Sequence, residues 1–361
     1  MSHFQAVVAV DDVTAEWLTQ VLIEAGRLAR GKVVDVSRAT CGTGQLADSF
    51  RFTLTYDPPQ AGPATLVGKF VSKDATSREF GRSSGYYRAE IGFYTELAPR
   101  LAMAIPTAVY AAIADNATDF VLLMEDLAPA RAVDQLIGCN ADESARVLEQ
   151  VAALHAATWH DKALAEIDWL KGTVGIFSHV SDTYADVIQN FPALAGDLVD
   201  ERDLREAAKL LGHVDAWKQA FSKPQCLWHS DLRADNVLFD AKGGSLPAVL
   251  LDWQGVGFGT GTIDVAYWIG TSMTVETRRA HEHELVMHYH DALCRYGVEG
   301  YSADTCWNDY RLHAIHGLQV GVFGLGAVKR TPRGDQMWKG WIERTAEQVR
   351  DLQSFDLLSG A

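Results

Sequence analysis

The pattern of hydrophobic and polar positions changes character near residue 125. Before this point apolar positions alternate with polar ones, most clearly in residues 49–56, where one side carries Phe50, Phe52, Leu54 and Tyr56. A period of two is typical of a strand with one buried face. After this point apolar positions recur every three or four residues, which is typical of helices packed on a core. We therefore expect a β-rich part followed by a larger α-rich part.

Capping and turn residues divide this pattern into elements. Asn140 and Glu143 have the spacing of a capping box, which marks the start of a helix. The run 57–63 contains three prolines and separates two strands. Helices are predicted over 11–25, 86–97 and 141–159 and throughout the chain after Asp264. Strands are predicted over 49–56, 64–72, 107–113, 120–124, 237–239 and 248–252.

Composition places the chain among ordinary globular proteins, with 361 residues, 48% hydrophobic and 22% charged. The net charge of −15 disfavours a nucleic acid as partner, because phosphates need clustered Lys and Arg. Five scattered cysteines without a Cys-x-x-Cys motif indicate a reducing compartment. The first residues do not have the pattern of a signal peptide. These features predict a cytoplasmic protein.

The uncharged stretch 312–328 raises the question of a membrane span. It contains His313, His316 and Gln319, and its glycines at 317 and 321 have the spacing of closely packed helices. We interpret it as a buried core helix, and we expect no membrane association.

The strongest chemical signal is the run His229-Ser-Asp-Leu-Arg-Ala-Asp-Asn236. Asp231 lies five residues before Asn236, and Asp252 ends an apolar run shortly afterwards. Hard cations such as magnesium prefer oxygen ligands, which a carboxylate and an amide carbonyl supply. In kinase-type sites this spacing provides a base for a hydroxyl group and two magnesium ligands.

This run resembles the small-molecule kinases of the aminoglycoside phosphotransferase and choline kinase group. The resemblance is closest to their ecdysteroid kinase-like branch, which typically reads His-Gly-Asp where this chain has Ser230. It implies an α+β, protein-kinase-like fold of two lobes. Residues 1–125 would form a small antiparallel β-rich N-lobe, and 126–361 a larger, mainly α-helical C-lobe. It also implies an enzyme that uses ATP and Mg²⁺ to phosphorylate a hydroxyl of a small molecule.

The same resemblance implies roles for the residues of the run. Asp231 would accept or orient the proton of the acceptor hydroxyl, and Asn236 and Asp252 would hold magnesium. Arg233 occupies the place where protein kinases carry a basic residue facing the γ-phosphate. His229 is expected to orient the loop by packing and hydrogen bonding.

The resemblance implies nucleotide-binding residues in the first part of the chain. Gly42 and Gly44 would let backbone amides approach phosphates, although a hairpin turn would also explain them. Lys69 lies in a predicted strand and would pair with Glu90 to hold the α- and β-phosphates. The alternative is an exposed lysine and a surface glutamate. Adenine would bind to the main chain near Met124, Glu125 and Leu127.

Several motifs have competing interpretations. Asp264 braces the backbone of the catalytic loop, as the resemblance implies, or caps the next helix, and the two roles are compatible. The glycine run 255–261 is not followed by the acid of a dinucleotide-binding site. The histidine-rich run 281–290 lacks the His-x-x-x-His spacing of a zinc helix and is expected to be a solvated helix face. His155 is expected to be a hydrogen-bonded core histidine.

The resulting hypothesis is a small-molecule kinase. A protein kinase is disfavoured because no Ala-Pro-Glu sequence follows Asp252. The alternative from another class is a pseudokinase that binds nucleotide without transferring phosphate. The residues favour a bulky, partly apolar alcohol as acceptor and do not indicate an oligomeric state.

Overall fold

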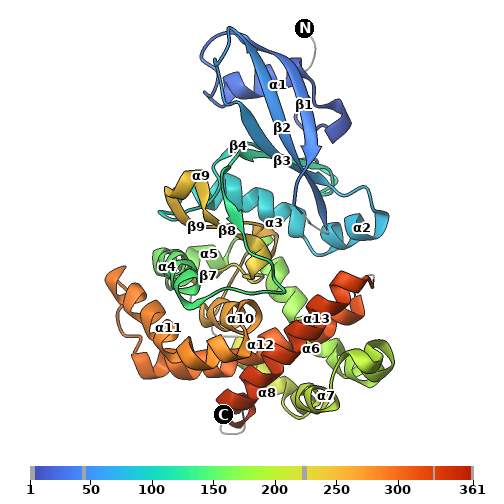
Figure 1. The fold of residues 1–361 in the computed structure, drawn as a ribbon, viewed down its shortest axis with the longest axis vertical. Helices are drawn as coiled ribbons and strands as arrows, with labels where there is room; N and C mark the ends of the chain where they lie inside the picture. The colour runs from blue at the N-terminus through green and yellow to red at the C-terminus, as the bar shows by residue number, and fades with distance from the viewer. Residues whose placement is uncertain (1–4, 43–45, 222–225, 328–329, 359–361) are drawn as a thin grey trace. The chain divides into compact units, whose positions relative to one another are not determined.

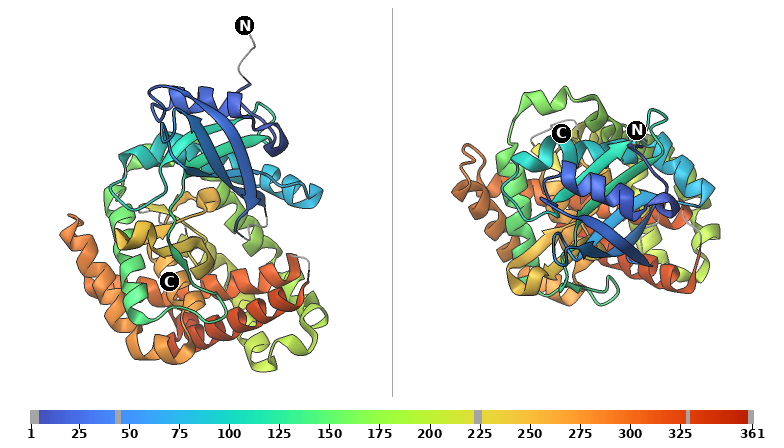
Figure 2. Two further views of the ribbon diagram at one scale, coloured as in Figure 1. Left: turned by 45° about the horizontal axis from the view of Figure 1, so that its top comes forward. Right: turned by 90° about the horizontal axis from the view of Figure 1, so that it is seen from above.

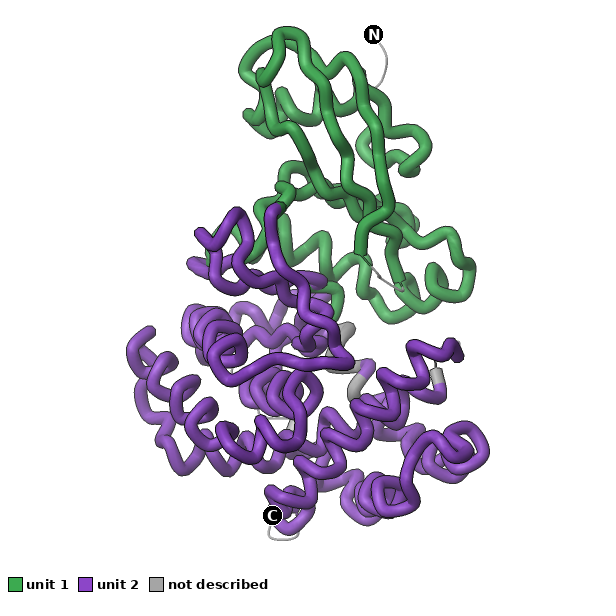
Figure 3. The backbone as a smooth tube through the Cα atoms, viewed as in Figure 1, with its two compact units in different colours: residues 1–101, 105–128, 253–255 green, residues 102–104, 129–252, 256–361 purple. Residues whose placement is uncertain are grey.

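The computed structural model describes residues 5–42, 46–221, 226–327 and 330–358 (Figure 1). The chain forms two compact units (Figure 3). Unit 1 comprises residues 1–101, 105–128 and 253–255, and unit 2 comprises 102–104, 129–252 and 256–361. Unit 1 contains an antiparallel sheet and unit 2 is mainly helical. The α+β fold class expected from the sequence is thereby confirmed.

The sheet of unit 1 has the strand order β1-β2-β3-β5-β4, and its neighbours pair antiparallel. The strands predicted from alternation are confirmed to within two residues. These are β2 (Ala47–Asp57), β3 (Thr65–Val71), β4 (Ala108–Ile113) and β5 (Phe120–Glu125), and the sheet also contains β1 (Lys32–Thr40), for which no bounds were predicted.

One face of this sheet is covered by α1 (Ala15–Glu24) (Figure 2). Trp17, Leu18 and Val21 of α1 are buried against apolar side chains of the sheet, among them Phe52. The predicted helix start at residue 11 is wrong, because the Thr14 side chain caps the helix and η1 (Val10–Asp12) forms a separate turn.

The opposite face of the sheet is in contact with α3 (Tyr86–Gly92), whose Tyr87 ring lies 4.9 Å from the ring of Phe120. The helix predicted over 86–97 is α3 followed by the wider turn η2 (Phe93–Leu97). The remaining elements of unit 1 are α2 (Ala75–Ser83), η3 (Ala98–Arg100) and η7 (Trp253–Gly255).

Unit 2 begins its helical part with α4 (Ala141–Ala157), and the capping box predicted for Asn140 and Glu143 is formed. The chain after residue 264 is helical, as predicted. The helices after α4 are α5 (Lys162–Ala165), α6 (Asp168–Ala195), α7 (Glu201–Ala208), α8 (Val214–Phe221), α9 (Ala241–Gly244), α10 (Thr262–Ser272), α11 (Val275–Arg295), α12 (Ala303–Ala327) and α13 (Pro332–Leu352). The short turns are η4 (Gly196–Leu198), η5 (Lys209–Gly212), η6 (Ala234–Asn236) and η8 (Ser354–Leu358).

Two small sheets complete unit 2. One has the order β6-β8-β9, with β6 (Arg131–Ala132), β8 (Val237–Asp240) and β9 (Leu246–Leu250). The other pairs β7 (Cys226–Trp228) with β10 (Gly257–Gly259). The glycine run 255–261 therefore contains a strand. A Cβ atom at Gly259 would lie 3.0 Å from the Trp228 ring, so close packing explains that glycine.

The uncharged stretch 312–328 lies in α12 up to residue 327, and residue 328 is outside the described part of the chain. Its glycines let α13 approach closely. A Cβ atom at Gly317 would lie 2.9 Å from Thr345, and one at Gly321 would lie 2.8 Å from Trp341. The predicted core helix is confirmed. Among the helices described, none is long and apolar enough to span a membrane.

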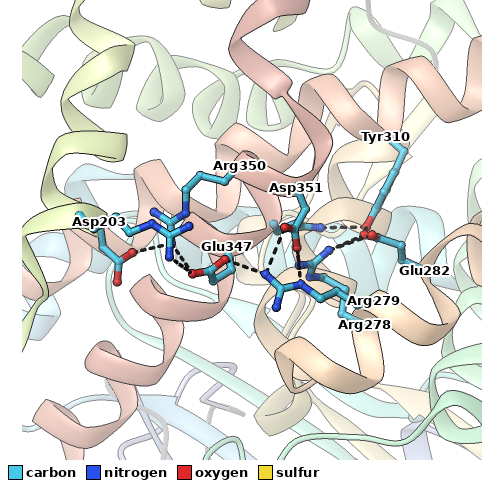
Figure 4. Close-up of polar contacts among 10 residues, drawn as sticks. Asp203, Arg278, Arg279, Glu282, Tyr310, Glu347, Arg350 and Asp351 are labelled. Atoms are coloured by element: carbon cyan, nitrogen blue, oxygen red, sulfur yellow. Dashed lines mark hydrogen bonds and ion pairs between the residues drawn. The ribbon is translucent and has the colours of Figure 1, made fainter.

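Charged side chains connect α7, α11 and α13, and we call this set the interhelical network (Figure 4). Arg278 and Arg279 of α11 both bind Asp351 of α13. Arg350 of α13 binds Asp203 of α7 at 2.7 Å. Its charged members are Arg202, Asp203, Arg278, Arg279, Glu282, Glu347, Arg350 and Asp351, and Tyr310 of α12 donates its hydroxyl to Glu282 at 2.9 Å.

Candidate functional site

The run around Asp231 forms a loop that follows β7 in unit 2, and Asp264 holds its backbone. Asp264 is completely buried on α10. One of its oxygens accepts the amide hydrogen of His229 at 2.6 Å, and the other accepts that of Ser230 at 2.8 Å. The bracing role expected for Asp264 is therefore present. The capping interpretation is wrong, because Gly261 is the residue at the cap position of α10.

Two buried histidines, His155 and His229, support this loop through hydrogen bonds. His155 lies between Tyr289 and Asp264, with its ring nitrogens 2.8 Å and 3.2 Å from their oxygens. His229 places Nε2 2.7 Å from the carbonyl oxygen of Leu251. Both therefore behave as the hydrogen-bonded core histidines that the sequence predicts.

Ser230 has a backbone conformation that favours glycine. Its backbone φ is +68°, in the left-handed region that side chains with a Cβ atom adopt at a cost. Asp252 has a φ of +61°. Backbone strain of this kind persists only where surrounding contacts impose it, and it is concentrated at functional sites. Here the two hydrogen bonds to Asp264 impose it on Ser230.

The carboxylate of Asp231 is held from three directions. Asn236 donates from Nδ2 to Oδ2 at 2.9 Å, and Tyr267 donates its hydroxyl to Oδ1 at 3.2 Å. Arg233 places Nε 3.4 Å from Oδ1 and binds Asp235 at 2.6 Å. Burial lowers the pKa of Arg233, but the neighbouring carboxylates outweigh it and the pKa is raised, so the guanidinium stays charged.

Asn236 and Asp252 lie close together, because the amide of Leu251 donates to the carbonyl oxygen of Asn236 at 2.9 Å. The Asn236 amide nitrogen binds Asp231, so its side-chain oxygen is oriented away from that carboxylate. The amide oxygen of Asn236 and the carboxylate of Asp252 thus belong to two backbone segments that are hydrogen-bonded to each other. This donor set fits magnesium, which accepts few protein oxygens and completes its shell with water and phosphate.

In unit 1 the sheet register places Lys69 opposite Leu122, on the face that contacts α3. Its ammonium group lies 2.8 Å and 2.7 Å from the two carboxylate oxygens of Glu90. The side chains of Lys69 and Glu90 are only 9% and 2% exposed. The neighbouring Lys73, by contrast, is 70% exposed and pairs with Asp11.

The other residues expected to bind nucleotide belong to unit 1. Gly42 follows β1 and has a φ of +76°, whereas Gly44 lies outside the described residues. Met124 and Glu125 end β5, and buried Leu127 follows. Two features here have no counterpart in the sequence analysis. Arg51 binds Asp126 at 2.7 Å, and the Trp253 ring stacks on that of Phe93 at 3.9 Å.

The histidine-rich run lies on α11, where its members have separate partners. His283 packs on Trp307, His288 faces Glu149, and His290 is 2.8 Å from the carbonyl oxygen of Tyr301. Tyr267, which donates its hydroxyl to Asp231, is a contact of the loop around Asp231 that the sequence did not predict. Its position three residues after Asp264 was the available signal, because residues with that spacing share a helix face.

Comparisons with known proteins agree with this fold. Residues 46–297, more than half of the chain, match the ecdysteroid kinase-like family (EcKL). No curated protein matches the chain.

Solved structures are also similar, including the following two. A candidate aminoglycoside phosphotransferase from Ralstonia eutropha has 12% identity and a TM-score of 0.51, with 93% of this chain and 98% of that chain covered. A microcompartment-associated aminopropanol kinase has 13% identity and a TM-score of 0.50, with 94% and 99% covered. At this identity the two structures indicate a shared fold. By its match over residues 46–297, the chain belongs to the ecdysteroid kinase-like family of kinase-like small-molecule phosphotransferases.

Proposed function

We propose that this chain transfers the γ-phosphoryl group of ATP to a hydroxyl group of a small molecule, with magnesium as cofactor. The observation that carries the proposal is the Asp231 carboxylate, which is held by Asn236 and Tyr267 in a loop braced by Asp264. A carboxylate oriented in this way is suited to a substrate hydroxyl. Family membership supports the reaction class.

Asp231 acts on the acceptor in this proposal. It orients the acceptor hydroxyl and accepts its proton as the oxygen forms a bond to the γ-phosphorus, while the bond to the β–γ bridging oxygen breaks and ADP leaves. Phosphoryl transfer depends mainly on positioning and on neutralising charge, so the base is the smaller contribution. Arg233 is assigned to the γ-phosphate. To bind it, the guanidinium group would leave its ion pair with Asp235.

Asn236 and Asp252 are the residues assigned to magnesium. When bound, the cation would offset the negative charge of the phosphates. In unit 1, Lys69 is assigned to the α- and β-phosphates, with Glu90 fixing its ammonium group. Gly42 and Gly44 are assigned to phosphate contacts, and the main chain at Met124, Glu125 and Leu127 to adenine. The Arg51–Asp126 contact supports this last segment, because it holds Asp126 at the end of β5.

The proposal is tested by screening alcohols for ADP release with the purified chain, ATP and magnesium. The library includes sterols, amino alcohols and aminoglycosides, because the sequence favours a bulky, partly apolar acceptor. Asp231→Asn keeps the size of the side chain and is expected to lower turnover by about 10²- to 10⁴-fold. Asp240→Asn is the matched control, since Asp240 pairs with surface arginines of unit 2.

The outcomes distinguish an enzyme from a pseudokinase. Turnover that requires magnesium and Asp231 supports the kinase. Nucleotide binding by calorimetry, together with an absence of turnover on every acceptor, would support a pseudokinase instead. Wild-type turnover in the Asp231→Asn variant would remove the assignment of the base.

A further inference from the structure

Tyr267 connects the helix that braces the catalytic loop with the Asp231 side chain. It belongs to α10, three residues after Asp264, so the two side chains leave the helix on the same face. Asp264 accepts the amides of His229 and Ser230, and Tyr267 donates to Asp231. One turn of α10 therefore holds three successive residues of the loop.

The contact places the Tyr267 hydroxyl on one specific oxygen. It donates to Oδ1 of Asp231 at 3.2 Å, whereas Asn236 donates to Oδ2 at 2.9 Å. With a donor on each oxygen, rotation of the carboxylate about its Cβ–Cγ bond is opposed. Oδ1 also lies 3.4 Å from Nε of Arg233, whereas Oδ2 retains a second lone pair for another partner.

The surroundings of Tyr267 hold its ring in place. The residue is 2% exposed, and its ring lies 5.2 Å from the ring of His316 and 5.3 Å from that of Trp341. Burial lowers the pKa of His316 to about 3, so this neighbour is neutral at physiological pH. A ring packed between two aromatic groups delivers its hydroxyl with little loss of conformational entropy.

We infer that Tyr267 is a positioning residue of the phosphotransfer reaction, which fixes the Asp231 carboxylate in the orientation that receives the acceptor hydroxyl. The inference rests on the proposed function. It differs from a purely structural role, in which the hydroxyl would only satisfy a buried polar group and would contribute to folding.

The test compares Tyr267→Phe with wild type in steady-state turnover, using the best acceptor from the alcohol screen. Phenylalanine keeps the ring between His316 and Trp341 and removes only the donor. We expect kcat to fall by about 10- to 100-fold, because misorientation of a reacting group has effects of this size. The KM for ATP is expected to change less than about twofold, since a donor acting on the base contributes little to nucleotide binding.

A matched control isolates the effect of losing a buried hydroxyl. Tyr184 of α6 is fully buried and donates to the carbonyl oxygen of Ala207 at 3.3 Å, with no contact to the catalytic loop. Tyr184→Phe is therefore expected to keep the kcat of wild type. Circular dichroism and the thermal midpoint establish that both variants are folded at the assay temperature.

The decisive measurement repeats Tyr267→Phe in the Asp231→Asn background. If Tyr267 acts through Asp231, its removal has no further effect on the residual kcat there. An equal fold-loss in both backgrounds, or a kcat for Tyr267→Phe within twofold of wild type, would overturn the inference and leave the proposed function intact. Full activity of Asp231→Asn alone would instead overturn the proposed function, and the inference with it.

Discussion

Two buried ion-pair systems, one in each unit, differ in how their charges are shared. In unit 1, Lys69 and Glu90 pair one ammonium group with one carboxylate. In unit 2, the interhelical network shares two carboxylates, those of Asp351 and Glu347, among several arginines. Asp351 binds Arg278 and Arg279, and Glu347 binds arginines of α7, α11 and α13.

This difference indicates what each system is for. A guanidinium group is planar, remains charged and can bind two carboxylates at once, so arginines suit permanent cross-links between helices. An ammonium group is a compact charge with three donors that can also bind phosphates. A single buried pair contributes little net stability, because desolvation opposes its attraction. We therefore expect the network to stabilise unit 2, and the Lys69–Glu90 pair to serve nucleotide binding as proposed above.

The largest expected effect is on stability, for Arg278→Met. Arg278 is 1% exposed and binds both Glu282 and Asp351. Methionine keeps the apolar stem but leaves Glu282 without a cation and Asp351 with Arg279 alone, which should lower the free energy of unfolding by about 3–5 kcal/mol. Urea unfolding at neutral pH measures this change. Turnover below the unfolding transition should remain that of wild type.

Arg279→Met is the matched control for this substitution. Arg279 is adjacent, binds the same Asp351 and is 49% exposed. Its loss should lower the free energy of unfolding by about 1 kcal/mol or less, as for exposed ion pairs. Equal losses in the two variants would contradict the view that burial makes Arg278 the centre of the network.

The second prediction concerns the pair in unit 1. Lys69→Met and Glu90→Gln should each lower kcat/KM for ATP by about 100-fold, and the double variant should lose little more than either single one, because the two residues act as a unit. Lys73→Met is the control, since Lys73 is exposed. Fully additive losses would mean that Glu90 does not act through Lys69.

Features that depend on residues close together in the chain could be predicted accurately from the sequence. The sheet strands of unit 1 and the capping box of α4 depend on alternation and on spacings of a few residues. The start of α1 was predicted four residues too early, because Asp11 and Thr14 are both good capping residues and only packing selects Thr14. The β7–β10 pair was missed because it joins two three-residue strands far apart in the chain.

The residues of the candidate site likewise fall into those that the sequence could identify and those that it could not. Asp231, Asn236 and Asp252 could be selected because their spacing carries chemical meaning. Tyr267 and Arg278 could not be distinguished from an ordinary core aromatic and an ordinary helix-surface arginine. Their roles depend on contacts with Asp231 and Asp351, which are distant in sequence.

The third prediction uses pH to test the network. Burial raises the pKa of Asp351 and of Glu347, but hydrogen bonds from arginines outweigh it and hold both pKa values below their usual range. Stability from a lowered carboxyl pKa is present above the unfolded pKa and is lost as pH falls through the folded pKa. The difference between wild type and Arg279→Met, about 1 kcal/mol or less at pH 7, should therefore begin to shrink as the pH falls below about 4 and disappear once the pH is below the folded pKa values. A constant difference from pH 7 to pH 3 in urea unfolding would show that Arg279 stabilises the fold by packing.

The smallest expected effect concerns the loop around Asp231. It tests whether the backbone conformation of this loop lowers stability, in contrast to the interhelical network, whose arginines lie in regular helices. Ser230 has a φ of +68°, which glycine adopts without a steric penalty. Ser230→Gly should raise the free energy of unfolding by about 0.5 kcal/mol, because relief of strain slightly exceeds the entropy gained by the unfolded chain. Ser230→Ala removes the hydroxyl group and keeps the strain, so it should be less stable than Ser230→Gly by about 1 kcal/mol. Thermal unfolding of the two variants measures this difference directly. Equal stabilities would mean that the hydroxyl group, and not the backbone conformation, determines the effect of substituting Ser230.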